Sequence, residues 1–548
     1  MTDTMAAPQK RSMTLVVLAS AAGTMFEWYD FFIFGSLAAI IAKHFFAGVS
    51  DSQAYLFALL TFAAGFFARP FGAVVFGRAG DIVGRKRTFL VTITVMGLAT
   101  FAVAFLPDYA QVGVAAPYAL IVVRVLQGFA IGGEYGGAAI YVAEHSSAKR
   151  RGLSTGWIQA AAGMGLILAL IVILVTRKSM GEETFGAWGW RIPFAVSFVL
   201  LALSLWIRLK LNESPMFQRI QDEGKLAKAP LSEAFLNGAN LKIVIVTLIG
   251  VLMGQGVVWY AAQFYTQFFL ERTLKVDPST VDALIMVVTI ASLPLYMFFA
   301  WVSDRIGRKP IMLLGLLMAT IGFIPGFKML TDAVNPALAA ASARAPVVVV
   351  ADPAHCSVQF DLIGKAKFVT SCDIAKSSLA NAGVSYTNTA AAPDAQASVH
   401  VGNTLVAAPE GSGLDKTQLA ATTKDFAARL KTALAGAGYP ASASGSGIDM
   451  PRTLLILLYF IIAACALYGP QAAALVELFP TRIRYTALSV PYHVGVGWFG
   501  GFLPPIAFAV VAATGNIYAG LWYPTVISAI GFIVTLFFVP ETKGRAID

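Results

Sequence analysis

The chain has 548 residues, of which 57% are hydrophobic and only 13% are charged. Soluble globular proteins carry about 25% charged residues, so this composition excludes an ordinary soluble domain. The formal net charge is +10. The basic residues stand in short loops between apolar stretches, where the positive-inside rule for membrane proteins places them, so we expect no nucleic-acid partner.

Apolar stretches of about 20 residues, the length needed to cross a bilayer, recur along the chain. Because irregular backbone cannot face lipid, these stretches predict transmembrane helices, and the fold class is an all-α membrane protein. The twelve predicted spans are residues 14–41, 53–76, 88–107, 117–141, 153–176, 188–209, 242–270, 281–302, 311–330, 451–475, 487–512 and 519–539.

The distribution of Lys and Arg over the predicted loops fixes the expected orientation. Loops on the side of the N-terminus hold Arg78, Arg85, Lys86, Arg87, Lys149, Arg150, Arg151, Arg219, Lys225, Lys228, Arg305, Arg308, Lys309, Arg482 and Arg484. The short loops on the opposite side hold few basic residues. We therefore expect both termini to be cytoplasmic.

An internal repeat divides the chain into two related halves. Residues 80–86 match residues 303–309 at an offset of 223, and Glu144 matches Glu477 at an offset of 333. The second half therefore holds about 110 extra residues between these two matches. The predicted organisation is a first six-helix bundle (1–210), a cytoplasmic linker (211–241), a second six-helix bundle (242–334 and 448–548) and an insertion (335–447) on the outer side.

The insertion is polar and is expected to form a small α+β domain. Residues 347–350 and 357–360 are predicted strands, and residues 417–435 are a predicted amphipathic helix. We predict a disulfide between Cys356 and Cys372, because the outer compartment permits oxidation and no third outer cysteine competes. The spacing of His355, Cys356, Cys372 and His400 matches no standard zinc site, so we expect no metal.

Five ionisable residues lie inside the predicted spans of the first half: Glu27, Asp30, Arg69, Arg124 and Glu134. Each costs roughly 2.5–3.5 kcal/mol at a helix centre, so they must pair or line a wet cavity. Static ion pairs are the alternative to a functional role. Glu27 and Asp30 share one helix face, and two close carboxylates cannot both stay ionised cheaply. Arg69 on the adjacent predicted span can neutralise one of the two carboxylates. We expect Glu27 to be the group that takes up a proton and Glu134 to be the second candidate.

The matching positions of the second half are uncharged, and its spans offer neutral polar and aromatic groups instead. Such groups suit the orientation of a small ligand. Arg124 is the candidate to bind a substrate carboxylate, because its planar fork can donate two parallel hydrogen bonds. Its alternative partner is Glu27 or Asp30. The other candidate substrate residues are Tyr29, Gln255, Trp259, Tyr260, Gln263, Tyr468 and Gln471.

Residues 77–87 form a predicted tight turn between the second and third spans, and residues 303–309 repeat it. Its charges can pair across the cytoplasmic face and separate as the halves rock. The candidate gating residues are Gly77, Gly80, Asp81, Gly84, Arg85, Lys86, Asp304, Gly307 and Arg308. The sequence shows no nucleophile–base set and no phosphate loop, so we expect no enzyme activity.

Residues 77–87 resemble the signature loop of the major facilitator superfamily. Residues 26–31, 69–72, 124–137, 477–484 and 498–501 resemble its metabolite:proton symporter family. The resemblance implies a monomer in the cytoplasmic membrane of a bacterium, with the proton as coupling ion and no other cofactor. It also implies that Arg69 pairs with Asp30, which leaves Glu27 to carry the coupling proton.

The family resemblance implies uptake of a small organic acid or of a zwitterionic osmolyte such as proline or betaine. The organic acid is our leading hypothesis, because the chain ends without the coiled coil that osmosensing members often carry. A third reading is a sensor whose outer insertion binds a ligand.

Overall fold

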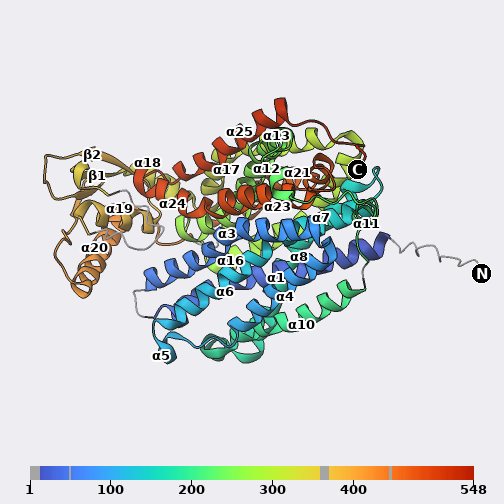
Figure 1. The fold of residues 1–548 in the computed structure, drawn as a ribbon. Helices are drawn as coiled ribbons and strands as arrows, with labels where there is room; N and C mark the ends of the chain where they lie inside the picture. Colours follow the sequence, from blue (N-terminus) through green and yellow to red (C-terminus); the bar gives the residue numbers. More distant parts are fainter. Residues whose placement is uncertain (1–12, 48–50, 211, 358–368, 444–446, 548) are drawn as a thin grey trace, which may run out of the picture.

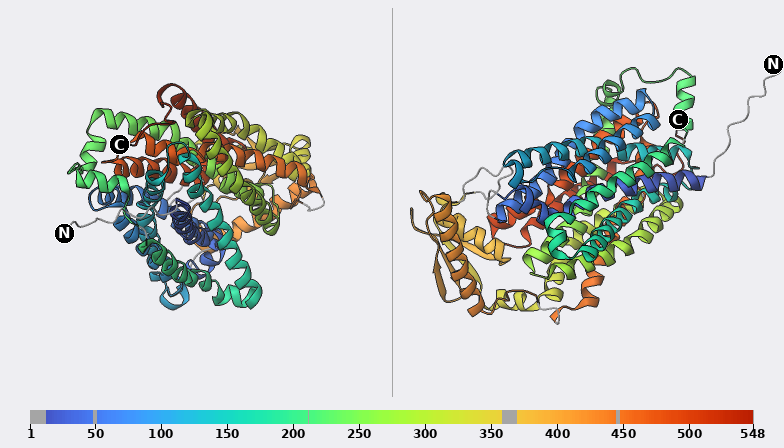
Figure 2. Two further views of the ribbon diagram at one scale, coloured as in Figure 1. Left: turned by 90° about the vertical axis from the view of Figure 1, so that its right-hand side faces the viewer. Right: turned by 90° about the horizontal axis from the view of Figure 1, so that it is seen from below.

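The computed structural model describes residues 13–47, 51–210, 212–357, 369–443 and 447–547. It consists of two helical halves packed side by side, with the insertion projecting from one end (Figures 1 and 2). We call that end the insertion end. The opposite end, where α1 begins and the Lys/Arg-rich loops lie, is called the basic end.

Six predicted spans of the first half are helical. They are α1 (Met13–Ser36) with α2 (Ala38–Phe45), α3 (Asp51–Ile82), α4 (Arg85–Val103), α6 (Ala115–Ile131) with α7 (Glu134–His145), α8 (Arg151–Met180) and α10 (Arg191–Leu209). The axis bends by 61° between α1 and α2. Two short helices, α11 (Pro215–Asp222) and α12 (Pro230–Phe235), lie in the predicted linker.

The second half repeats this arrangement with more irregular helices. Its first span runs from α13 (Gly238–Thr247) through η2 (Leu248–Leu252), α14 (Met253–Tyr260), η3 (Ala261–Tyr265) and α15 (Thr266–Phe268) to η4 (Phe269–Thr273). The others are α16 (Pro278–Ile306), α17 (Arg308–Val334), α21 (Met450–Tyr468) with α22 (Gln471–Leu478), α23 (Arg484–Tyr492) with η7 (His493–Gly500) and α24 (Leu503–Thr514), and α25 (Trp522–Phe538).

The number of spans agrees with the sequence prediction. Within the described residues, ten helical segments are long and apolar enough to cross a membrane, and the bent α1–α2 pair provides an eleventh. The twelfth is α3, a helix of 32 residues. The fold is therefore an all-α membrane bundle of twelve helices.

The insertion contains a four-stranded sheet flanked by helices. Its elements are α18 (Pro336–Arg344), β1 (Val347–Ala351), α19 (Ser371–Ala382), β2 (Tyr386–Ala390), β3 (Ser398–Val401), β4 (Thr404–Ala407) and α20 (Lys416–Gly436). The strand order is β2-β1-β3-β4, with β1 parallel to β2 and antiparallel to β3. Alternate residues of β1 are buried, and the α20 residues Phe426 and Leu430 are also buried in the core.

The predicted strand at 347–350 and the helix at 417–435 are present as β1 and α20. The strand predicted at 357–360 lies outside the described residues after Ser357. Sequence patterns missed α19 and three strands, because these elements are short and alternate only weakly. Cys356 and Cys372 are joined by a disulfide, as predicted, with their Cα atoms 5.2 Å apart.

Hydrogen bonds fasten the insertion to the second half. The Tyr386 N–H donates to the Gly515 carbonyl at 2.7 Å, between the last two spans. The Lys275 ammonium donates to the Asn381 carbonyl at 2.6 Å, and the Ala443 N–H donates to the Lys275 carbonyl at 3.0 Å. The insertion is therefore anchored on the end of the bundle opposite the repeated basic loops (Figure 1).

Candidate functional site

The repeated loop joins the two halves at the basic end. Asp81 accepts hydrogen bonds from the backbone N–H groups of Tyr485 and Thr486, at 3.1 and 2.9 Å. Arg85 donates to the Thr481 carbonyl at 2.8 Å. The turn requires glycine at Gly84, whose φ of 117° is rarely adopted by other residues.

The second copy of the loop, in the second half, makes the equivalent contacts with the first half. Asp304 accepts hydrogen bonds from the N–H groups of Gly152 and Leu153, each at 2.8 Å, at the start of α8. Gly307 has a φ of 118°, like Gly84. Each loop therefore places its aspartate on the N-terminus of a helix in the other half, where the helix dipole favours a negative charge.

Two buried ionic clusters complete these contacts. In the first, Glu144 binds Arg484 of the other half at 2.7 Å and Arg85 at 3.4 Å. In the second, Glu477 binds Arg151 of the other half at 2.8 Å and Arg308 at 3.2 Å. The ion pairs that join the halves are thus Glu144–Arg484 and Glu477–Arg151, whereas the loop residues Arg85 and Arg308 pair with carboxylates of their own halves. The repeat match between Glu144 and Glu477 marks equivalent positions.

Two further carboxylates anchor these loops. Glu213 accepts from the Lys86 N–H at 3.1 Å, and Glu541 accepts from the N–H groups of Arg308 and Lys309 at 2.9 and 3.0 Å. Burial alone raises the pKa of Glu541, but the hydrogen bonds from four backbone N–H groups lower it below its ordinary value. Glu541 therefore stays ionised at neutral pH.

A separate ionic cluster lies deeper in the first half. Arg208 of α10 forms an ion pair with Glu27 of α1, and its Nη1 lies 3.5 Å from Oε1 of Glu134 of α7. All three side chains are buried. We call these residues the Arg208 cluster. Glu27 therefore pairs with Arg208, whereas the sequence suggested Arg124 as its alternative partner.

The structure does not form the expected Asp30–Arg69 pair. Asp30 accepts a hydrogen bond of 2.6 Å from the Ser197 hydroxyl. The guanidinium of Arg69 instead lies over the rings of Phe31 and Phe66, at 4.7 and 4.2 Å from their centroids. Cation–π contact with two rings replaces the ion pair that the sequence suggested.

Arg124 belongs to a polar chain that runs through the first half. Its Nη1 donates to Gln127 Oε1 at 2.7 Å, and Gln127 donates to the Thr100 hydroxyl at 2.7 Å. Arg124 also lies 4.2 Å from the centroid of Phe34. Arg69 and Arg124 are close enough to interact as like charges, and both approach the ring of Phe31. Two guanidinium groups therefore approach each other beside the ring of Phe31.

The second half faces Arg69 with neutral groups. Tyr260, Tyr468, Tyr492 and His493 all interact electrostatically with the Arg69 guanidinium. The hydroxyls of Tyr468 and Tyr492 lie 3.0 Å apart. His493 begins the π-helical segment η7, and such wide turns are frequent at functional sites.

Several buried polar atoms of the second half have no hydrogen-bond partner among the described residues. They are Oε1 of Gln255 and Gln263, both amide atoms of Gln471 and both ring nitrogens of His493. Buried polar groups are nearly always hydrogen-bonded in proteins. These atoms are therefore candidates to bind a polar ligand or ordered water, and the substrate role of the three glutamines stays a prediction.

Two predicted substrate residues have structural partners instead. The Tyr29 hydroxyl donates to the Pro193 carbonyl at 2.8 Å and fastens α1 to α10, and its assignment to the substrate site stays a prediction. Trp259 donates from Nε1 to the Tyr296 hydroxyl at 3.0 Å, and its ring packs 5.8 Å from Trp28 of the first half. Sequence reasoning missed Arg208 and Ser197 as partners of the buried carboxylates, because these contacts join segments that are distant in the sequence.

Comparisons with known proteins agree with this geometry. The profile of the "Sugar (and other) transporter" family matches residues 15–243 and 429–548. The chain belongs to this family. The fold is that of the major facilitator superfamily: it superimposes on the proton:xylose symporter XylE of Escherichia coli with a TM-score of 0.64 and 17% identity, covering 98% of this chain and 97% of that one.

Curated relatives of this transporter are themselves transporters. The shikimate transporter of Escherichia coli K12 is 36% identical over 57% of this chain and 72% of its own length. The proline/betaine transporter of the same organism is 31% identical over 58% of this chain and 64% of its own length. A glycine betaine/proline/ectoine/pipecolic acid transporter of Dickeya dadantii is 31% identical over 96% of this chain and 83% of its own length. The chain is a membrane transporter and not an enzyme.

Aromatic rings bring the halves of this transporter together in the middle of the bundle. Phe32 stacks on Phe264 with centroids 6.0 Å apart, and Phe66 meets Tyr260 at 5.5 Å. Tyr135 stacks on Tyr492 at 3.7 Å. Ring contacts therefore join the two halves in the middle of the bundle, while the two ionic clusters join them at the basic end.

One candidate metal cluster lies in the insertion of the transporter. Ligand atoms of Asp352, His355 and Asp394 all lie within 4.8 Å of one another. His355 lies between the carboxylates, with ring nitrogens 3.6 and 3.5 Å from Asp352 and Asp394. Both ring nitrogens thus already face a carboxylate, and we assign no metal here.

Proposed function

We propose that the chain is a proton-coupled symporter that imports a small organic acid by alternating access. The observation that carries this proposal is the charge balance in the first half. Apart from the repeated loops and the two ionic clusters at the basic end, the described helices of the first half bury three carboxylates and three guanidinium groups: Glu27, Asp30, Glu134, Arg69, Arg124 and Arg208.

The formal sum of these six charges is zero when all are ionised. A proton on one carboxylate leaves an excess positive charge, and a bound substrate carboxylate returns the sum to zero. An uncompensated charge in low dielectric is costly, so the fully loaded and the empty sites are the favourable states for reorientation. Obligatory coupling of one proton to one carboxylate follows from this balance.

Arg69 and Arg124 are the proposed ligands of the substrate carboxylate. They approach each other over Phe31, so a bound anion relieves their mutual repulsion. His493 and the tyrosines Tyr260, Tyr468 and Tyr492 of the second half face the same region with neutral donors and acceptors. They suit the hydroxyl groups and ring of a small organic acid.

The Arg208 cluster is the proposed proton site. Two carboxylates share one guanidinium there, so one of them is left without full compensation in a buried environment. Glu27 makes the closer contact with Arg208 but is also the carboxylate nearest to Asp30 on the same helix face. We retain Glu27 as the first candidate and Glu134 as the second.

The basic end is proposed to be cytoplasmic, since the Lys and Arg residues gather in its loops. Both termini then lie in the cytoplasm and the insertion lies outside, in the cytoplasmic membrane of a bacterium. We expect the transporter to work as a monomer, because the proposed substrate and proton sites are complete within one chain.

The relatives support two substrate classes. The shikimate transporter favours an organic acid, and the betaine and proline transporters favour a zwitterion. The charge balance favours the organic acid, because a zwitterion brings no net charge to offset the proton.

A competition screen with purified protein in proteoliposomes tests the proposed substrate class. With an inward pH gradient, we expect monocarboxylic acids to be accumulated and betaines to compete weakly. Accumulation must collapse when a protonophore removes the gradient. Strong uptake of proline or betaine, with no competition by organic acids, would assign the chain to the osmolyte class.

Deletion of residues 345–445 with a short linker tests the sensor alternative. We expect the truncated protein to keep most of its transport, because the internal repeat completes both bundles without the insertion. Surface expression is measured in parallel by labelling an epitope tag. A truncated protein that reaches the membrane but transports nothing would give the insertion an essential role, through its contacts with Lys275 and Gly515.

A further inference from the structure

Tyr485 crosses from the second half into the first. It lies in the first turn of α23 and is completely buried. Its hydroxyl donates to the carbonyl of Gly133, the residue that directly precedes Glu134. Its own backbone N–H donates to Asp81. One residue of the second half therefore touches both the loop that closes the basic end and the helix that carries Glu134.

The first half receives this ring in a slot made by glycines. A Cβ atom on Gly80 would overlap the Tyr485 ring, and one on Gly137 would lie 2.5 Å from the hydroxyl. Real side chains do not tolerate such distances, so the close fit depends on glycine at both positions. We call Gly80, Gly133 and Gly137 the glycine slot.

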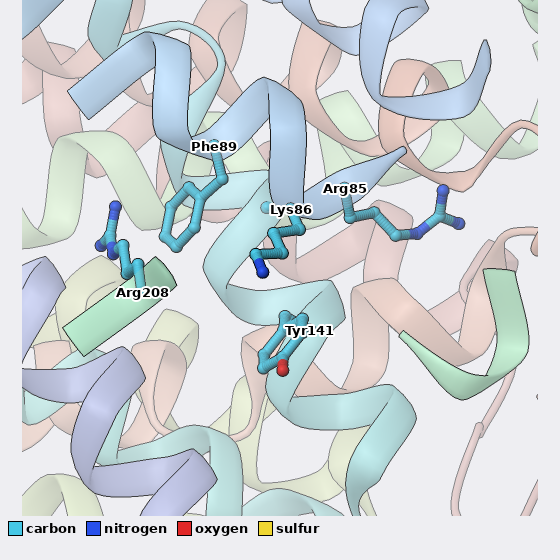
Figure 3. A pocket seen from close by; sticks show the side chains of 6 residues that line it. Arg85, Lys86, Phe89, Tyr141 and Arg208 are labelled. Atoms are coloured by element: carbon cyan, nitrogen blue, oxygen red, sulfur yellow. The ribbon is translucent and has the colours of Figure 1, made fainter. Parts of the chain in front are cut away.

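The glycine slot lies next to the Arg208 cluster. Gly137 also lines a small pocket with Arg208, Phe89, Lys86 and Tyr141, and in Figure 3 the Phe89 ring lies between Arg208 and Lys86. The Arg208 guanidinium lies 3.5 Å from the centroid of Phe89.

The charged groups that face Tyr485 come from four helices of the first half. They are Glu134, Arg85, Asp81 and Arg208. The ring therefore stands between the ionic cluster at the basic end and the deeper Arg208 cluster.

We propose that Tyr485 is a movable plug that controls access from the basic end to Glu134 and Arg208. The ring belongs to the half that moves away when the basic end opens, so opening withdraws it from the glycine slot. Water then reaches the Arg208 cluster from that side. While the ring is seated, the cluster is sealed and protons do not leak through the closed transporter.

This proposal rests on the proposed role of the Arg208 cluster in proton coupling. It makes Tyr485 a positioning residue and not a proton carrier, since its hydroxyl is held by the Gly133 carbonyl. The plug also gives a reason for glycine at Gly80 of α3 and at Gly137 of α7. The positive-inside rule explains the basic residues of the loop but not these glycines.

Two measurements on the full-length protein test the plug. The first is hydrogen–deuterium exchange of peptides covering residues 133–140, recorded without substrate. The second is substrate-independent proton flux into proteoliposomes, followed with an entrapped pH-sensitive dye. Tyr485→Ala should exchange about tenfold faster in these peptides and should leak protons, because an emptied slot lowers the cost of local opening.

Tyr485→Phe keeps the ring and should stay close to wild type in proton leak, with a smaller increase in exchange. Tyr141→Phe is the matched control, because the Tyr141 hydroxyl donates to the carbonyl of Asn212, which lies in the linker and not in the second half. If Tyr485→Ala is poorly folded, Gly137→Ala expels the ring by crowding the slot and should reproduce both effects.

Wild-type exchange and wild-type proton leak in both Tyr485→Ala and Gly137→Ala would overturn the plug. A separate result would contradict the role of the Arg208 cluster in proton coupling, namely that Glu27→Gln and Glu134→Gln both still accumulate substrate. In that case the exchange measurement would still report whether the Tyr485 ring seals the glycine slot.

Discussion

Glu27→Gln is expected to abolish proton-driven accumulation of the substrate while exchange at equal pH on both sides remains measurable. Glutamine keeps the shape of the side chain but cannot take up a proton. Arg208 keeps Glu134 as an ionic partner in this variant, so the guanidinium is not left unpaired in the membrane. The transporter can then still reorient with substrate, but without a bound proton to drive it uphill.

The measurement compares uptake under an imposed pH gradient with counterflow of labelled substrate in the same proteoliposomes. Glu183→Gln is the control, because Glu183 is exposed at the insertion end and has no part in the cluster. If Glu27→Gln still accumulates substrate against its gradient, the proton site lies elsewhere, and Glu134→Gln is the next variant.

The helices and the basic end could be predicted because their signals are local in sequence. The spans follow from runs of apolar residues, and the loop at 77–87 is repeated at 303–309. The repeat also matched Glu144 with Glu477, and these residues occupy equivalent ionic clusters in the structure. The repeat could not show that each of these glutamates forms an ion pair with an arginine of the other half.

The partners of the buried charges could not be predicted from spacing alone. Arg208 stands at the end of a predicted span, where the positive-inside rule already accounts for a basic residue. In the structure its side chain is buried and forms an ion pair with Glu27. Gly23 permits this, since a Cβ atom there would overlap the guanidinium. Asp30 and Arg69 were expected to pair, but Ser197 and two phenylalanine rings hold them apart. Such choices depend on helix rotation and packing.

Arg124→Lys is expected to raise the apparent substrate KM by about ten- to a hundredfold, the effect of losing one charge-assisted hydrogen bond worth about 1.5–3 kcal/mol. Lysine keeps the positive charge but has no planar fork, so it cannot bind a carboxylate through two parallel hydrogen bonds. The contact with Gln127 is also weakened, which disturbs the polar chain toward Thr100.

The initial rate of uptake against substrate concentration separates this effect from a folding defect, because a misfolded fraction lowers the maximal rate and leaves KM unchanged. Arg177→Lys is the control, since Arg177 lies near the insertion end of α8 and its partner there is Glu182. An unchanged KM in Arg124→Lys would exclude direct contact with the carboxylate and leave Arg69 as the remaining candidate.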